Sequence, residues 1–196
     1  MSLVSIIATQ DFISVMTDGR ISGGTQAERS ENYPKFQVLV ESKSFIAYVG
    51  DKEFAESVVE FAKVLASQGK SIKEIACTIQ SRLSRGQNLA KHCGKVVELV
   101  IGGFDERVSQ FYVVSNEKEL KPFQPSGENY VLYANEVITQ QDVESQLALY
   151  LKKNQSLITA EVAQVAQEKL LNYISRFEPS VNCIPFKHLL DKPQNI

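Results

Sequence analysis

The chain has 196 residues, of which 43% are hydrophobic, with a formal net charge of −2 and three cysteines. This length supports one sizeable core, so we expect a single domain over residues 1–196. The near-neutral charge without a basic cluster argues against a nucleic-acid surface, and no apolar run is long enough to cross a membrane. The odd number of cysteines argues against a disulfide framework, and the N-terminus lacks the features of a signal peptide, so a cytoplasmic location is expected.

The first twenty residues predict a hairpin of buried strands. Two apolar runs rich in β-branched residues, Leu3–Ala8 and Phe12–Met16, are separated by a polar break, and the second run leads into Thr17-Asp18-Gly19-Arg20. Both runs are too short for buried helices. A buried strand that starts at Leu3 fixes the terminal amine in space. With Ser2 inside Met1, this places a hydroxyl beside an amine, which is a nucleophile beside its own base.

The rest of the chain alternates strands with pairs of helices. Segment 21–34 is polar and contains glycine, so we expect a surface loop there. Strands are predicted at Lys35–Glu41, Ser44–Gly50, 96–104, 108–114, Asn129–Ala134 and Cys183–Leu190, and helices at 51–69, 71–86, 139–152 and 159–176. Ser71 and Glu74 form a capping-box pattern, and Thr139 and Thr159 are expected to cap the last two helices. Polar loops are expected at 87–94 and around Pro122 and Pro125.

This order of elements predicts an α+β fold. Two antiparallel sheets stacked face to face, each covered on its outer side by a helix pair, would form a four-layer αββα sandwich. The run VVELVIGGF is apolar almost throughout, which is typical of a strand buried on both faces. The order of elements alone does not exclude a two-layer α+β domain.

Three stretches of the sequence resemble a known family. SLVSIIATQDFISVMTDGR, KFQVLVESKSFIAYVGDKEFAESVVEFA and VELVIGGFDERVSQFYVV are similar, in this order, to stretches of the proteasome β-type subunits. They are also similar to the bacterial ATP-dependent peptidase subunit that shares the proteasome fold. The family belongs to the N-terminal nucleophile hydrolases, so the resemblance implies the four-layer sandwich.

The resemblance also implies a catalytic nucleophile. In this family the first residue, a threonine and in some relatives a serine or cysteine, attacks the scissile carbonyl, and its α-amine is the general base. Counted back from Asp18-Gly19, this position falls on Ser2. Removal of Met1 would expose it, and the small side chain of serine suits methionine excision. An α-amine has an unperturbed pKa of about 8, close to the working pH of a base.

Three further positions match the site of the family. Asp18 and Lys35 match an aspartate and a lysine, whose ammonium lowers the pKa of the amine while the carboxylate holds the lysine charged and oriented. Gly50 matches the residue whose backbone N–H binds the oxyanion. From the residues alone, Asp18 also fits a turn former and Gly50-Asp51 a helix entry, and Lys35 fits a solvated strand start better than a site residue.

The implied activity is a peptidase that needs neither a cofactor nor a metal. The adjacent His92 and Cys93 lack an acid partner or the spacing of a metal site, and Asp105-Glu106 fit a solvated turn better than an acid/base pair. Peptides would be the substrates and an ATP-dependent unfoldase a partner. The chain would assemble with its own copies into a ring or a dimer. Neither nucleic acid nor a membrane is an expected partner.

Two departures from the family favour an alternative, a non-catalytic subunit with a structural or assembly role. The family has Gly-Ser-Gly where this chain has Tyr133-Ala134-Asn135-Glu136, and its serine supports the catalytic amine. The family also has an aspartate where this chain has Lys153-Asn154-Gln155-Ser156. If the natural chain begins at Val4 behind its own methionine, the nucleophile is absent as well.

Overall fold

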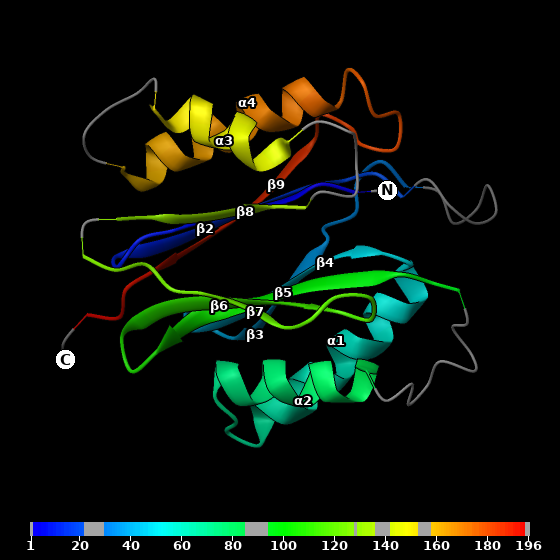
Figure 1. Cartoon of the computed structure of the whole chain (residues 1–196), viewed down its shortest axis with the longest axis vertical. Helices are drawn as coiled ribbons and strands as arrows, with labels where there is room; N and C mark the ends of the chain where they lie inside the picture. The colour runs from blue at the N-terminus through cyan, green and yellow to red at the C-terminus, as the bar shows by residue number, and fades with distance from the viewer. Residues whose placement is uncertain are drawn as a thin grey trace. The chain divides into compact units, whose positions relative to one another are not determined.

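A computed structural model describes residues 2–21, 30–84, 94–127, 129–135, 142–152 and 158–194. Over these ranges it contains two antiparallel sheets and two pairs of helices (Figure 1). The chain divides into two compact units. The first unit comprises Met1–Lys35 and Pro125–Asp191, and the second comprises Phe36–Gln124 and Lys192–Ile196. The expectation of a single domain over residues 1–196 stays a prediction.

The first unit contains a four-stranded sheet in the order β8-β1-β2-β9. Its elements are β1 (Val4–Ala8), β2 (Phe12–Asp18), β8 (Val131–Ala134), β9 (Pro185–Asp191), α3 (Val143–Lys152) and α4 (Ala160–Ile174). The predicted β1–β2 hairpin pairs from Val4 with Thr17 to Ala8 with Ile13. Its turn closes where the Thr9 N–H donates to the carbonyl of Phe12. Every residue of β1 and β2 is buried, as their apolar runs predict.

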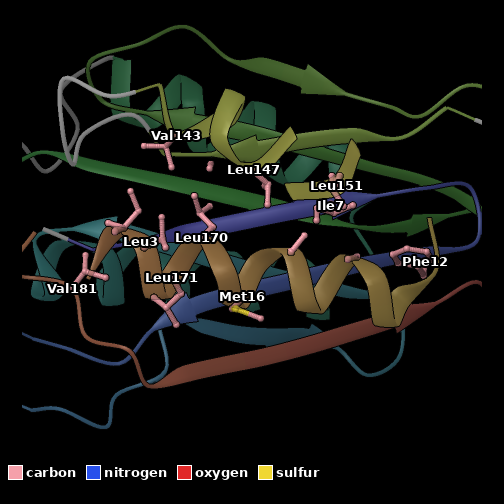
Figure 2. Packing of buried hydrophobic residues seen from close by; sticks show 14 residues of the cluster. Leu3, Ile7, Phe12, Met16, Val143, Leu147, Leu151, Leu170, Leu171 and Val181 are labelled. Atoms are coloured by element: carbon pink, nitrogen blue, oxygen red, sulfur yellow. The ribbon is translucent and has the colours of Figure 1, made fainter. Parts of the chain in front are cut away.

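The core of the first unit lies between its sheet and the helices α3 and α4 (Figure 2). Alternate residues of β1 and β2 point toward the helices because side chains alternate between the two faces of a strand. The cluster consists of Leu3, Ile7, Phe12, Met16, Ala134, Val143, Leu147, Leu151, Ala163, Ala166, Leu170, Leu171, Ile174 and Val181. The N-terminal segment is therefore anchored in a hydrophobic core directly beside Ser2.

A buried amide joins α4 to this sheet. The side chain of Gln167 donates to the Ser5 carbonyl over 2.9 Å and accepts from the Ser14 hydroxyl over 2.6 Å. All three residues are buried, and each polar group has a partner, as buried polar groups require. The network fixes how α4 lies across β1 and β2.

The second unit contains a five-stranded sheet in the order β3-β4-β5-β6-β7. Its elements are β3 (Phe36–Val40), β4 (Ser44–Gly50), β5 (Val97–Asp105), β6 (Val108–Ser115), β7 (Lys121–Phe123), α1 (Lys52–Ser67) and α2 (Ile72–Ser84). Helix α1 packs against β3, β4 and β5, and α2 packs against β5 and β6. Figure 1 shows both helices on the same side of this sheet.

The helix starts follow the predicted caps in most cases. Asp51 caps α1 and Thr159 caps α4. At α2, the Glu74 N–H donates to Ser71 Oγ over 3.2 Å, and Glu74 Oε2 accepts from the Ser71 N–H over 2.9 Å, which is the reciprocal capping box. Helix α3 begins at Val143, where Asp142 accepts from the backbone N–H of the third residue, and the predicted cap Thr139 lies outside the described residues.

Two predictions about loops and turns differ from the structure, and a third lies almost entirely outside the described residues. The predicted loop around Pro122 contains the short edge strand β7, which pairs with β6. Asp105 is not a solvated turn residue, because its carboxylate accepts from the backbone N–H of Ile72 at the start of α2. The predicted 87–94 loop lies almost entirely outside the described residues.

Among the helices of the described ranges, none is long and apolar enough to span a membrane.

Candidate active site

Asp18 and Lys35 form a buried ion pair in the first unit. Asp18 is the last residue of β2, and Lys35 immediately precedes β3. The Nζ atom of Lys35 lies 2.6 Å from Oδ1 of Asp18, and the two side chains are 5% and 0% exposed. The Lys35 N–H also donates to Thr17 Oγ1 over 3.4 Å. Lys35 is therefore not a solvated strand start, and Asp18 is more than a turn former.

Burial is the main influence on the charge of Lys35. It lowers the pKa of the ammonium below its usual value, while the charge of Asp18 and its hydrogen bond raise the pKa and offset part of this effect. A lysine with a lowered pKa releases its proton more readily than an exposed lysine. An ammonium here also repels a second positive charge placed nearby.

The same carboxylate holds the N-terminal segment. Asp18 Oδ1 accepts from the Leu3 N–H over 2.7 Å, and the Asp18 N–H donates to the Leu3 carbonyl over 3.2 Å. Asp18 Oδ2 accepts from the Arg20 N–H over 2.9 Å. Asp18 thus joins Lys35 to the peptide group that follows Ser2. Three of the four predicted site positions, Ser2, Asp18 and Lys35, therefore lie in one cluster, and the fourth is Gly50.

Asn135 holds Ser2 from the side of β8. Its Nδ2 donates to the Ser2 carbonyl over 2.7 Å, and its Oδ1 accepts from the Val4 N–H over 2.7 Å. Asn135 is fully buried and Ser2 is 8% exposed. Asn135 stands in the stretch that replaces the Gly-Ser-Gly of the family, and sequence reasoning did not assign it a role. The local indication in the sequence was an asparagine directly after the predicted strand Asn129–Ala134.

The turn after Asp18 is fixed by a second buried asparagine. Asn182 Oδ1 accepts from the Gly19 N–H over 2.9 Å, and its Nδ2 donates to the carbonyl of Glu31 over 2.8 Å. Arg20 pairs with the carboxylate of Glu31. A Cβ at Gly19 would lie 2.8 Å from the Glu31 carbonyl oxygen, so this close approach requires glycine. Neither Asn182 nor Glu31 was predicted as part of the site.

Gly50 belongs to the second unit. It ends β4 with a φ of +106°, and a Cβ there would lie 2.1 Å from the carbonyl oxygen of Val96. The position therefore requires glycine for its backbone alone, and the Asp51 N–H that follows it donates to the same Val96 oxygen over 3.0 Å. The role of the Gly50 N–H toward an oxyanion stays a prediction.

Metal chemistry has no site among the residues that the structure describes. Within these ranges, no group of three or more His, Cys, Asp or Glu side chains is placed to hold a metal ion. His92 and Cys93 lie outside the described residues. Asp18 and Lys35 place a carboxylate and an ammonium beside the peptide group that follows Ser2, and these are groups used in acid–base and nucleophilic chemistry.

Comparison with solved structures identifies the fold. The model matches the crystal structure of eukaryotic HslV from Trypanosoma brucei with a TM-score of 0.69 and 9% sequence identity, over 96% of this chain and 99% of that chain. The chain has the fold of HslV. This confirms the predicted α+β fold, and it confirms at the level of fold the resemblance to the proteasome β-type family. No protein-family model matches the sequence, and no curated protein matches it at a significant level.

The HslV fold accounts for the placement of the cluster. The N-terminal strand β1 is an inner strand of its sheet, so the segment that precedes it is hydrogen-bonded from both neighbouring strands. Ser2, Asp18 and Lys35 lie on or beside the first three strands in chain order. The nucleophilic and acid–base roles of these residues and of Gly50 stay predictions.

Proposed function

We propose that this chain is an amide hydrolase, specifically a peptidase, which uses Ser2 as its N-terminal nucleophile after removal of Met1. One observation carries the proposal. The carboxylate of Asp18 binds both the buried ammonium of Lys35 and the N–H of the peptide that joins Ser2 to Leu3. The fold shared with HslV supports the same function but does not by itself carry it.

The proposed reaction proceeds in two steps through an ester. The α-amine of Ser2 accepts the proton of the Ser2 hydroxyl as Oγ attacks the carbonyl carbon of a peptide bond, and the protonated amine then delivers this proton to the leaving nitrogen. Water activated by the same amine hydrolyses the resulting acyl ester, which releases the acid and restores the hydroxyl. The backbone N–H of Gly50 is the proposed donor to the oxyanion.

Lys35 and Asp18 affect the protonation of the Ser2 amine, but they take no part in the bonds that form and break. A charged Lys35 disfavours protonation of a neighbouring amine, which keeps more of the Ser2 amine in its basic form at neutral pH. Asp18 orients Lys35 and offsets part of the cost of burying it. The proposal extends to a closed assembly of identical copies and an ATP-dependent unfoldase as partner, both of which rest on the family resemblance. It also extends to a cytoplasmic location, which rests on the odd number of cysteines without paired spacing.

A non-catalytic subunit is the second candidate, and Asn135 is the observation that favours it. The family has a serine in this stretch that supports the catalytic amine. The Asn135 amide instead bonds through Oδ1 and Nδ2 to the main chain of Val4 and Ser2. In this alternative the cluster stabilises the fold and has no catalytic role.

The experiment that separates the two candidates begins with the N-terminus. Intact mass and N-terminal sequencing of the native protein establish whether Met1 has been removed and Ser2 is the first residue. The processed protein is then incubated with short fluorogenic peptides and with a covalent inhibitor directed at N-terminal nucleophiles. We expect turnover and an adduct that mass spectrometry localises to Ser2.

The matched variants are Ser2→Ala and Ser126→Ala, since Ser126 is exposed and lies in the same unit. Ser2→Ala should lose the adduct and the turnover, and Ser126→Ala should keep both. A processed wild-type protein that shows neither adduct nor turnover would leave the non-catalytic candidate.

A further inference from the structure

We propose that Asn135 is a positioning residue for the N-terminal serine. Its side-chain amide continues the hydrogen-bond ladder between β8 and β1 by one step and fixes the peptide group that follows Ser2. This inference rests on the proposed function, because the group it positions is the proposed nucleophile. It assigns a role to a residue of the stretch that stands where the family has Gly-Ser-Gly.

The ladder on this side of β1 ends in the side chain of Asn135. The last regular pair joins Ser5 to Ala134, and the next backbone bond runs from the Asn135 N–H to the Val4 carbonyl over 3.2 Å. Beyond it, the carboxamide of Asn135 accepts from the Val4 N–H and donates to the Ser2 carbonyl, each over 2.7 Å. A carboxamide has the donor and acceptor of a peptide group, so it takes the place of one more residue of β8.

The other side of the same segment is held by Asp18. The peptide group between Ser2 and Leu3 donates its N–H to Asp18 Oδ1 over 2.7 Å, and its carbonyl accepts from Asn135 Nδ2 over 2.7 Å. One peptide plane is therefore bonded at both ends to fully buried side chains. This arrangement leaves little freedom for the plane to tilt or shift.

A fixed peptide plane restricts Ser2 to two rotations. With its carbonyl carbon held, only rotation about the Cα–C bond and about the Cα–Cβ bond can move the amine and the hydroxyl. Both reacting groups thus stay close to one place relative to Lys35, which is bound to the same carboxylate. Preorganisation of this kind speeds a reaction because little conformational freedom is lost on reaching the transition state. Asn135 itself is neutral and exchanges no proton.

The test compares two buried amides of the same unit. Asn135→Leu removes both bonds to the N-terminal segment. Gln167→Leu is the matched control, because it also removes a buried amide that bonds to β1, but at Ser5 rather than at Ser2. Asn135→Asp is the conservative variant, which keeps an acceptor for the Val4 N–H and loses the donor to the Ser2 carbonyl. In all of these proteins, cleavage of a removable leader makes Ser2 the N-terminal residue.

The first readout does not depend on activity. Periodate cleaves the Cα–Cβ bond of an N-terminal serine that carries a free amine, and intact mass follows the reaction. We expect Asn135→Leu to be oxidised at least about fivefold faster than the wild type, because the variant loses two hydrogen bonds and the loss of one ordinary hydrogen bond already corresponds to about this factor. Gln167→Leu should react at the wild-type rate. The second readout is covalent inhibition, in which Asn135→Leu should lower the inactivation rate constant and leave the inhibitor affinity unchanged.

Each outcome decides one question. Equal periodate rates for Asn135→Leu and the wild type, or an equal acceleration in Gln167→Leu, would overturn the positioning role. If the wild type is not labelled by the inhibitor, the proposed function fails, and the periodate rates still decide whether Asn135 holds Ser2. If Asn135→Leu does not fold, Asn135→Asp replaces it, and an unchanged periodate rate in that variant overturns the inference.

Discussion

The ammonium of Lys35 lies 2.6 Å from the carboxylate of Asp18, and both groups are shielded from solvent. A buried ion pair gains little over an apolar pair, but removing one partner leaves the other charge uncompensated. We therefore expect Lys35→Met to lower the free energy of unfolding by about 3–5 kcal/mol. Denaturant unfolding at neutral pH measures this change.

The control for this prediction is the double variant Asp18→Asn/Lys35→Met, in which both charges are absent. It should be more stable than Lys35→Met alone, although Asp18→Asn also weakens the bonds to Leu3 and Arg20. Additive losses in the double variant would show that the two groups are not energetically coupled.

Glu74 should make the stability of the protein depend on acid pH. Its bonds to the backbone N–H of Ser71, to Lys70 and to the Ser71 hydroxyl lower the pKa of the carboxyl from 4.5 to about 2. The folded state therefore binds fewer protons than the unfolded state between these values. The stabilisation is fully present above pH 4.5 and is lost as the pH falls toward about 2.

The variant Glu74→Gln tests this dependence, because glutamine keeps a capping side chain without the titration. Denaturant unfolding across the acid range should give a shallower loss of stability for Glu74→Gln than for the wild type. Other carboxylates titrate equally in both proteins. Parallel pH profiles would contradict the prediction.

Gly50→Ala should destabilise the protein whether or not Gly50 takes part in catalysis. The φ of +106° disfavours any side chain, and a Cβ would meet the carbonyl oxygen of Val96 at 2.1 Å. We expect a loss of more than about 2 kcal/mol, measured by thermal or denaturant unfolding. Gly69→Ala is the control, since its φ is also positive but nothing lies within 4 Å of the added Cβ. A smaller loss in Gly50→Ala than in Gly69→Ala would contradict the prediction.

Removal of the buried amide of Gln167 should cost about 1–3 kcal/mol, because Gln167→Leu leaves the Ser14 hydroxyl and the Ser5 carbonyl without this partner. Adding Ser14→Ala should recover part of the loss, since the hydroxyl that needs a partner is then absent. Unfolding of the single and double variants measures the coupling. A double variant that loses the sum of the two single effects would argue against the network.

Local patterns in the sequence predicted most of the fold. The apolar runs of β1, β2, β4 and β5 correspond to strands that are buried almost throughout, and Ser71 with Glu74 fixes the start of α2. The short strand β7 was not predicted because it is only three residues long and has Pro122 at its centre, a residue that cannot donate to a ladder. Helix α3 is described from Val143, directly after Asp142, and the predicted cap Thr139 lies outside the described residues.

The candidate site was predicted only in part. Asp18 and Lys35 were found through the family resemblance, and the structure brings them into direct contact. Asn135 was not found, because its partners Ser2 and Val4 lie far away in the sequence and no periodicity links them. Asn182 was missed for the same reason. A side chain that completes the hydrogen bonds of a distant segment leaves no regular pattern near its own position.

The position of β9 also has a consequence for the order of folding during synthesis. β9 pairs with β2 along the full length of the strand, and β8 pairs with β1, yet both partners are translated long after the hairpin. The segment Phe36–Gln124, by contrast, contains a complete sheet with its two helices. On the ribosome the segment Phe36–Gln124 can therefore fold first, while the apolar hairpin that follows Ser2 remains unpaired on the β2 side until β9 has been translated. A nascent chain that lacks residues 185–191 would leave β2 as an open, aggregation-prone edge.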